Sequence, residues 1–258
     1  MKSYLKVVLA SLTFLSCKKE DAKPIEKPDT IKNGLIAYYP FTGNTKDSSG
    51  NNYDLTENTA TLAKDKAGNS NTAYYFDGVN SSMTIPSMPK ANLLDSFTIS
   101  FWMRPATHSV VSPRLMAFQP YADQPSGIPV TYSHSIELYN PPSTTTYRVQ
   151  AVLGTCTFTQ FNNSCSGTGV NDAITNTLNT WKHVAFGKRG RALYLYVDGK
   201  KFTNLADKDI LASFGFGGRI GNGRFNDRSW FKGELDEIRI HNRLLSEEEV
   251  QQLYTRVQ

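Results

Sequence analysis

The chain has 258 residues, of which 39% are hydrophobic and 20% charged, and it contains 13 Tyr and 14 Phe. This composition excludes a wholly disordered chain, a collagen-like repeat and a coiled coil. The formal net charge is +5, but residues 1–33 hold seven Lys against four acids. The remaining residues carry no basic stripe, which argues against nucleic acid as a partner.

The N-terminus is typical of an exported protein. Lys2 and Lys6 flank a short apolar run, residues 7–15, which ends at Ser16-Cys17. This pattern predicts a signal peptide over residues 1–16. Residues 17–33 are polar and contain two Pro, so we expect a flexible tether there.

The string F-L-S-C resembles a bacterial lipobox, although Phe14 stands where that pattern usually has Leu. The resemblance implies that Cys17 is lipidated; ordinary signal cleavage would leave Cys17 as a free thiol. The charged residues 18–21 resemble the tract after the lipidated Cys in surface lipoproteins of Bacteroidetes. We therefore expect a surface-exposed outer-membrane lipoprotein that contacts the membrane only through its lipid.

Two further cysteines, Cys156 and Cys165, are separated by a stretch rich in Asn, Ser and Thr. An even pair in an exported chain predicts a disulfide that closes a hairpin. A zinc site would need further Cys or His at ligand spacing, and none is near in the sequence.

From residue 35 onward, apolar residues recur with period two in short runs bounded by Gly, Pro, Asn and Asp, which predicts strands. Asp198-Gly199 predicts a two-residue hairpin turn. Many short strands without helical patterns between them indicate an all-β fold with two packed antiparallel sheets. The predicted strands are residues 35–39, 74–76, 82–85, 97–103, 114–118, 135–139, 147–153, 181–186, 193–197, 200–202, 218–220 and 233–240.

One helix is predicted, over residues 247–254 at the C-terminus. Ser246 and Glu249 form a capping box, and Leu245 and Val250 have the spacing of a hydrophobic staple. No change in composition divides residues 34–258, so we expect one domain there.

Several strings resemble the laminin G-like, concanavalin A-like lectin/glucanase superfamily in order and spacing. The resemblance implies a jelly-roll sandwich with a short C-terminal helix. The strings are residues 34–51 (GLIAYYPFTGNTKDSSGN), 73–79 (AYYFDGV), 97–105 (FTISFWMRP), 181–184 (WKHV), 195–199 (LYVDG) and 231–254.

Retaining glucanases of this superfamily carry E-x-D-x-x-E, with a nucleophile and an acid/base on opposite sides of the bond. The comparable string here begins at Glu234 and ends at Arg239, which replaces the last acid. A guanidinium cannot protonate a leaving group. We therefore expect no glucanase activity; a polysaccharide lyase with a Tyr or His base is a further alternative.

The string D-S-S-G-N-N, which begins at Asp47, gathers oxygen ligands in a short loop, as calcium prefers. An Asx-turn that needs no ion is the alternative. The resemblance implies that Asp47 and Asp236 share a structural calcium, and Asn52 is a third candidate ligand. Leu235 and Ile238 are three residues apart, so the period-two phase breaks between them and predicts a β-bulge near Asp236.

Sugars are bound by aromatic faces and a few convergent polar groups on loops. Trp230, Tyr121, Tyr132 and Arg224 lie in or beside segments with little apolar periodicity, so we predict that they contact a ligand. The alternative for each aromatic residue is partial burial as a lid over the sheet. Trp102 and Trp181 lie in strand patterns and are predicted to be core.

We expect a lipid-anchored, non-catalytic module that binds a polysaccharide or glycoconjugate. The alternative is a structural or adhesive module that recognises a protein or matrix partner, because a fold does not fix a function.

Overall fold

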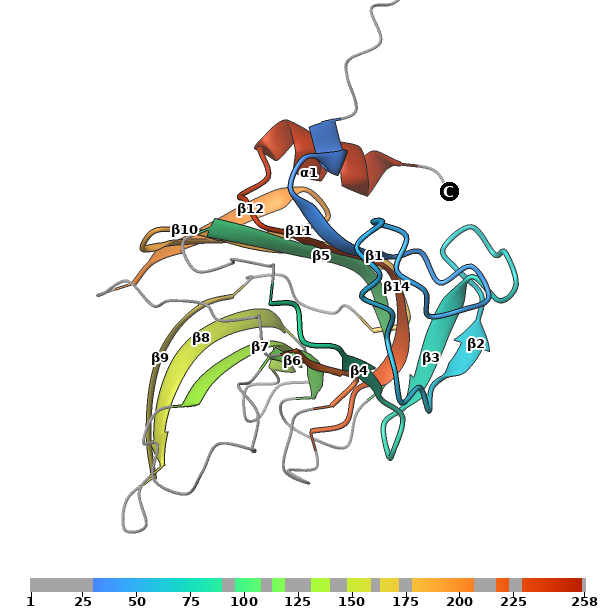
Figure 1. The fold of residues 1–258 in the computed structure, drawn as a ribbon, viewed down its shortest axis with the longest axis horizontal. Coiled ribbons are helices and arrows are strands. Elements are labelled where there is room, and N and C mark those ends of the chain that lie inside the picture. The colour runs from blue at the N-terminus through green and yellow to red at the C-terminus, as the bar shows by residue number, and fades with distance from the viewer. Residues whose placement is uncertain are drawn as a thin grey trace, which may run out of the picture.

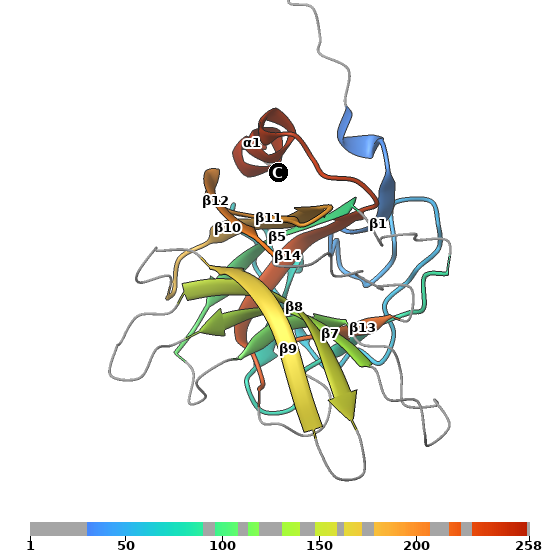
Figure 2. The same ribbon diagram turned by 90° about the vertical axis from the view of Figure 1, so that its left-hand side faces the viewer.

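The computed structural model describes residues 30–89, 96–107, 113–118, 131–139, 148–158, 163–171, 178–206, 217–222 and 229–256. They form two antiparallel sheets that face each other, as predicted (Figures 1 and 2). The large sheet has the order β12-β11-β10-β5-β14-β3-β2, and β1 also pairs with β14. The small sheet has the order β4-β13-β6-β7-β8-β9.

The strands of the large sheet are β1 (Leu35–Tyr39), β2 (Thr61–Ala63), β3 (Ala73–Asp77), β5 (Ser96–Pro105), β10 (Lys182–Arg189), β11 (Ala192–Val197), β12 (Lys200–Leu205) and β14 (Lys232–His241). Those of the small sheet are β4 (Met83–Ile85), β6 (Arg114–Phe118), β7 (Thr131–Tyr139), β8 (Arg148–Phe158), β9 (Asn163–Asn171) and β13 (Gly218–Ile220). A 3₁₀ helix, η1 (Thr30–Lys32), and a helix, α1 (Glu247–Thr255), complete the elements.

The main core lies between the sheets and follows from the period-two patterns. On β5, the side chains of Phe97, Ile99, Phe101 and Met103 are fully buried in this core. Each such side chain stabilises the fold by about 1.5–3 kcal/mol relative to an exposed one. The intervening residues of β5 therefore point to the outer face of the large sheet.

The predicted hairpin turn joins β11 to β12, with Asp198 at φ 50° and Gly199 at φ 76°, the two left-handed residues of a type I′ turn. Strand β9 was not predicted, because its Asn, Ser, Gly and Thr residues lack apolar alternation. Its register with β8 pairs Cys156 with Cys165. The disulfide between them stays a prediction, because their side chains lie outside the described part of the structure.

The C-terminal helix α1 packs on the outer face of the large sheet (Figure 1). The Ser246 hydroxyl accepts from the Glu249 backbone N–H, and the Glu249 carboxylate accepts from that of Ser246, so the predicted capping box is confirmed. Leu245 and Val250 share a second apolar cluster, which also holds Ile31, Ala185, Tyr196 and Leu253. Helix α1 thereby closes one end of the sheet's outer face.

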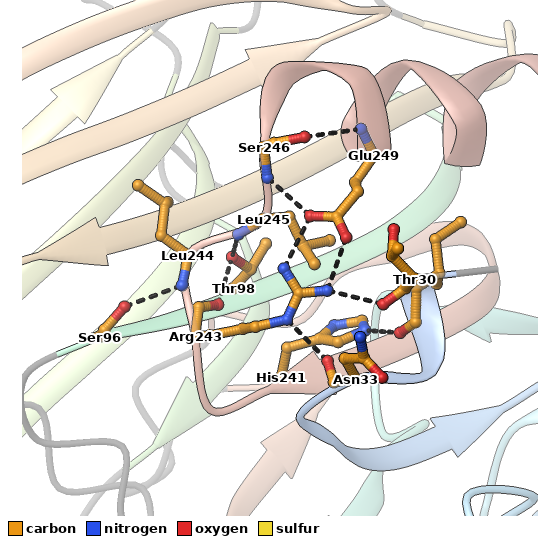
Figure 3. A network of polar contacts seen from close by, with 11 residues as sticks. Thr30, Asn33, Ser96, Thr98, His241, Arg243, Leu244, Leu245, Ser246 and Glu249 are labelled. Atoms are coloured by element: carbon orange, nitrogen blue, oxygen red, sulfur yellow. Dashed lines mark hydrogen bonds and ion pairs between the residues drawn. The ribbon is translucent and has the colours of Figure 1, made fainter. Parts of the chain in front are cut away.

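Arg243 joins the two ends of the described chain (Figure 3). Its guanidinium donates to both oxygens of Glu249, at 2.7 Å each, and to the backbone carbonyls of Thr30 and Asn33. Ile31 is buried in the second cluster. The predicted tether over residues 17–33 is therefore too long, because its last residues are part of the folded domain.

The predicted signal peptide, Cys17 and the rest of the tether lie outside the described residues. No helix in the described ranges combines the length and the apolar character needed to cross a membrane.

Candidate binding surface on the outer face of the large sheet

A β-bulge in β14 confirms the predicted break in phase. Asp236 lies opposite Trp102 on β5, and Arg239 lies opposite Ser100, so two residues of β14 oppose one of β5. The extra residue brings Glu237 into the left-handed region, with φ 55°. At the bulge Ile238 still faces the core, while the charged side chains of its neighbours Glu237 and Arg239 face outward.

Glu237 and Arg239 form a buried ion pair on this outer face. The Tyr38 hydroxyl donates to Glu237 Oε1 at 2.7 Å, and the Arg239 guanidinium lies 4.0 Å from the centre of the Tyr38 ring. Burial raises the pKa of Tyr38, and the Arg239 charge opposes that rise. The side chains of Arg239 and Glu237 are 6% and 8% exposed, so solvent screens the attraction between their charges only weakly.

Asp236 is 1% exposed, and its Oδ1 accepts the backbone N–H of Glu237 at 2.7 Å. Burial and the neighbouring Glu237 charge raise the pKa of Asp236 to about 8. Burial thus favours the protonated form of this carboxyl. Its burial keeps it away from any ligand in solvent.

Lys66, in the turn after β2, reaches over the same face. Its Nζ lies 3.8 Å from the centre of the Trp102 ring and donates to the Arg256 carbonyl at 2.7 Å. Burial lowers the pKa of Lys66, although the Glu237, Asp236 and Asp65 carboxylates oppose that change. The Tyr254 ring stacks on Trp102 with centres 6.0 Å apart. Trp102 is thus buried, as predicted, but between polar groups of the outer face.

A more open row crosses the sheet beyond Trp102. Arg104 on β5 binds Glu234 on β14 with two hydrogen bonds, Nε to Oε2 at 3.1 Å and an Nη to Oε1 at 2.5 Å. The Arg104 Cζ lies 6.0 Å from the centre of the Trp181 ring, which precedes β10. Tyr75 on β3 lies opposite Glu234.

Trp181 and Tyr75 are both half-buried. The prediction that Trp181 belongs to the core is wrong, because the side chain lies at the end of a strand and beside a charged group. The four residues Trp181, Arg104, Glu234 and Tyr75, here called the outer-face row, combine aromatic faces with fixed donors and acceptors. That combination suits a sugar ring, whose C–H faces contact aromatic rings while its hydroxyls need hydrogen bonds.

His183 is fully buried beneath this face, with its ring centre 5.3 Å from that of Trp102. Burial lowers its pKa to about 3, and the Arg239 and Lys66 charges add to that effect. At neutral pH His183 is uncharged. It therefore supports the sheet as a buried aromatic residue.

Asp47 lies in the loop after β1, where protein donors surround it. Its Oδ1 accepts the backbone N–H groups of Tyr38 and Ser49, at 2.9 and 2.8 Å. Its Oδ2 accepts that of Tyr53 at 3.0 Å and the Ser49 hydroxyl at 2.8 Å. Asn52 is exposed in the same loop with φ 60°. These contacts fit the Asx-turn alternative.

The described contacts do not bring Asp47 to Asp236. The groups that perturb the pKa of Asp236 are Glu237, Asp65 and Arg239. Within the described residues, no three side chains of His, Cys, Asp or Glu gather as metal ligands. The protein donors around Asp47 favour the Asx-turn alternative, and the calcium roles of Asp47, Asn52 and Asp236 stay predictions.

Of the predicted ligand contacts, Trp230 is half-buried beside the small sheet, where it bridges to Arg114 at the start of β6. Tyr132 lies on β7, but its side chain is outside the described part. Tyr121 and Arg224 lie outside the described residues. The sequence analysis did not predict the outer-face row. The period-two pattern of β5 nevertheless places Arg104 on the face opposite Met103.

Comparison with known proteins supports the fold. A family model described as the Concanavalin A-like lectin/glucanases superfamily matches residues 76–251. A sequence comparison with curated proteins finds no match.

Many solved structures resemble the chain, including the following three. Domain 4 of AbnA, a GH43 extracellular arabinanase from Geobacillus stearothermophilus, in complex with arabinotriose, has a TM-score of 0.59 at 20% identity, covering 86% of this chain and 98% of that one. The binding domain of Paraclostridial Mosquitocidal Protein 1 has a TM-score of 0.61 at 18% identity, covering 87% and 52%. Botulinum neurotoxin type C, whose cell entry depends on interaction with two ganglioside molecules, has a TM-score of 0.61 at 14% identity, covering 87% and 52%. The chain spans about half the length of the two toxin chains, and at these identities the similarity shows a shared fold.

Proposed function

Because the chain belongs to the concanavalin A-like lectin/glucanase superfamily, we propose that it is a non-catalytic carbohydrate-binding module anchored at the outer membrane through a lipid on Cys17. The observation that carries the binding proposal is the outer-face row. There the half-buried rings of Trp181 and Tyr75 flank an ion pair between Arg104 and Glu234. The fold likeness to an arabinanase domain in complex with arabinotriose adds support.

The row has the parts that sugar recognition needs. The Arg104 and Glu234 side chains fix each other through two hydrogen bonds, so they present N–H and carboxylate groups in one orientation. Side chains ordered in advance lose less conformational entropy when a ligand binds. The rings on either side offer apolar faces to a sugar.

The contacts of the acids in the glucanase-like string favour a non-catalytic role. Glu234 is engaged by Arg104, and Asp236 is 1% exposed beneath the surface. Arg239, in place of the last acid, is paired with Glu237. A retaining mechanism needs two accessible carboxyl groups about 5–5.5 Å apart across the bond. These contacts support a binding role.

The binding proposal is tested with the chain without residues 1–17, screened against neutral plant, algal, fungal and host glycans. We expect retention of at least one glycan, and about tenfold weaker binding after Trp181→Ala, a loss of about 1.4 kcal/mol. Trp230→Ala is the matched control, because Trp230 is also half-buried but lies beside the small sheet. Circular dichroism checks that each variant folds.

Retention lost with Trp230→Ala and kept with Trp181→Ala would move the site to the predicted loop residues. No retention would overturn the binding proposal and favour a protein partner. Reducing-sugar and unsaturated-product assays on the same samples test catalysis, and product formation would overturn the non-catalytic role.

The lipid anchor is tested separately with the full chain in a bacterial host. The wild-type protein should partition into detergent, and Cys17→Ala should remain in the aqueous phase. Equal partitioning of the two proteins would refute the anchor.

A further inference from the structure

A pocket lies away from the outer-face row, between η1, β1, the Asp47 loop and the end of α1. Its volume is about 300 Å³, at the lower end of the range for ligand pockets. Ile31 and Leu35 form its apolar wall. The polar lining residues are Lys32, Tyr38, Ser48, Ser49, Arg239 and Arg256.

The lining is cationic. Lys32, Arg239 and Arg256 contribute positive charge, and none of the described lining residues is acidic. Glu237 lies behind the lining and pairs with Arg239. The carboxylate of Asp47, next to Ser48, is occupied by four hydrogen bonds from protein groups. An anion entering this pocket would meet mainly hydrogen-bond donors.

Several of these donors are available to a ligand. Arg239 is 5% exposed, and its two terminal nitrogens contact Glu237. Within the described part of the chain, its Nε makes no hydrogen bond, and neither do the Ser48 hydroxyl and the Lys32 ammonium. A buried guanidinium that keeps one N–H unused, beside a hydroxyl and an ammonium, suits an oxyanion.

The geometry points to a site for a sugar that carries an oxyanion, either a carboxylate or a sulfate ester. The anionic group would bind between Arg239, Ser48 and Lys32, with the sugar ring against Leu35 and Ile31. Arg256 would add charge at the edge of the pocket. This inference stands apart from the outer-face row, which is offered for neutral glycans.

The test is isothermal titration of the chain without residues 1–17, at low and at physiological salt. The probes are glucuronate, glucose 6-sulfate, neutral glucose and acetate. We expect one of the two charged sugars to bind at least about tenfold more tightly than glucose and acetate, more weakly at high salt. The two charged probes distinguish a carboxylate from a sulfate ester.

The double variant Lys32→Ala, Arg256→Ala should lose about tenfold in affinity for the charged sugar. Both side chains are exposed, so we expect the variant to fold. Ser48→Ala tests the hydroxyl without changing charge and should weaken binding about threefold. Lys64→Ala is the control, because Lys64 is exposed and does not line the pocket.

Trp181→Ala should leave binding of the charged sugar unchanged, which separates this inference from the proposed function. Charged sugars that bind no more tightly than glucose would overturn it. So would equal loss in Lys64→Ala and the double variant, since that result would indicate attraction by overall charge.

Discussion

Replacing Glu249 with Gln should remove the ion pair that joins the C-terminal helix to Arg243. The Glu249 carboxylate accepts two 2.7 Å hydrogen bonds from Arg243 and one from the Ser246 backbone, and it is 7% exposed (Figure 3). These contacts, the hydrogen bonds from Arg243 foremost, lower the pKa of Glu249 from 4.5 to about 2. At about 1.4 kcal/mol per pH unit, that difference corresponds to about 3 kcal/mol of stability at neutral pH.

The sign of the pH dependence follows from the direction of the change. Because the folded pKa lies below the unfolded value, the stabilisation is present above pH 4.5 and is lost as the pH falls to about 2. Wild type and Glu249→Gln should therefore differ by about 3 kcal/mol at pH 7 and converge near pH 2. In melting temperature, the difference at pH 7 corresponds to about 6–12 °C.

The assay is urea unfolding followed by circular dichroism between pH 2 and pH 7. Glu248→Gln is the control, since Glu248 lies in the same first turn of α1 but is exposed. Its unfolding free energy should change by less than about 1 kcal/mol. A difference between wild type and Glu249→Gln that stays constant from pH 2 to pH 7 would refute the electrostatic reasoning and indicate lost packing.

Three further measurements test other parts of the structure. Reduction should add two hydrogens to the intact mass, because the register pairs Cys156 with Cys165, and should lower the unfolding free energy by about 2–3 kcal/mol; two free thiols before reduction would contradict the bridge. A chelator should change the melting temperature by less than about 1 °C, because protein donors already occupy Asp47; a fall of several degrees, reversed by calcium, would support the implied calcium site. Gly221→Ala should destabilise by more than about 2 kcal/mol, because a Cβ would lie 2.3 Å from Phe76 Cδ1, whereas Gly68→Ala, with positive φ but open space around its Cβ, should be milder.

The sandwich could be predicted because its core residues carry the period of their strands. Leu193, Leu195 and Val197 alternate in the sequence and are fully buried in the structure. The capping box was readable for a similar reason, since Ser246 and Glu249 lie within one helical turn. Strand β9 could not be predicted, because its backbone pairing with β8 does not depend on apolar side chains.

The contacts of the candidate sites were harder to predict, because strand pairing brings together residues far apart in the sequence. The β14 bulge was visible in the spacing of Leu235 and Ile238. The sequence did not show that Lys66 and Tyr38 contact the bulge. Lys66 follows β2, a strand of three residues without an apolar pattern. For the same reason, Trp230 was preferred to Trp181 as a ligand contact. The exposure of a side chain at the end of a strand depends on the neighbouring strands, and no local sequence pattern indicates it.

The bulge also explains how β14 contributes to two surfaces, the outer-face row through Glu234 and the cationic pocket through Arg239. Before it, residues 232–235 of β14 pair with β3, and after it, residues 238–241 pair with β1, while β5 runs along the other edge. The added residue places the Glu237–Arg239 pair at the change of partner, beneath Tyr38. A buried ion pair contributes little net stability compared with well-packed apolar side chains. Its consequence here is positional: Glu237 contacts two nitrogens of Arg239 and thereby fixes the guanidinium that lines the cationic pocket.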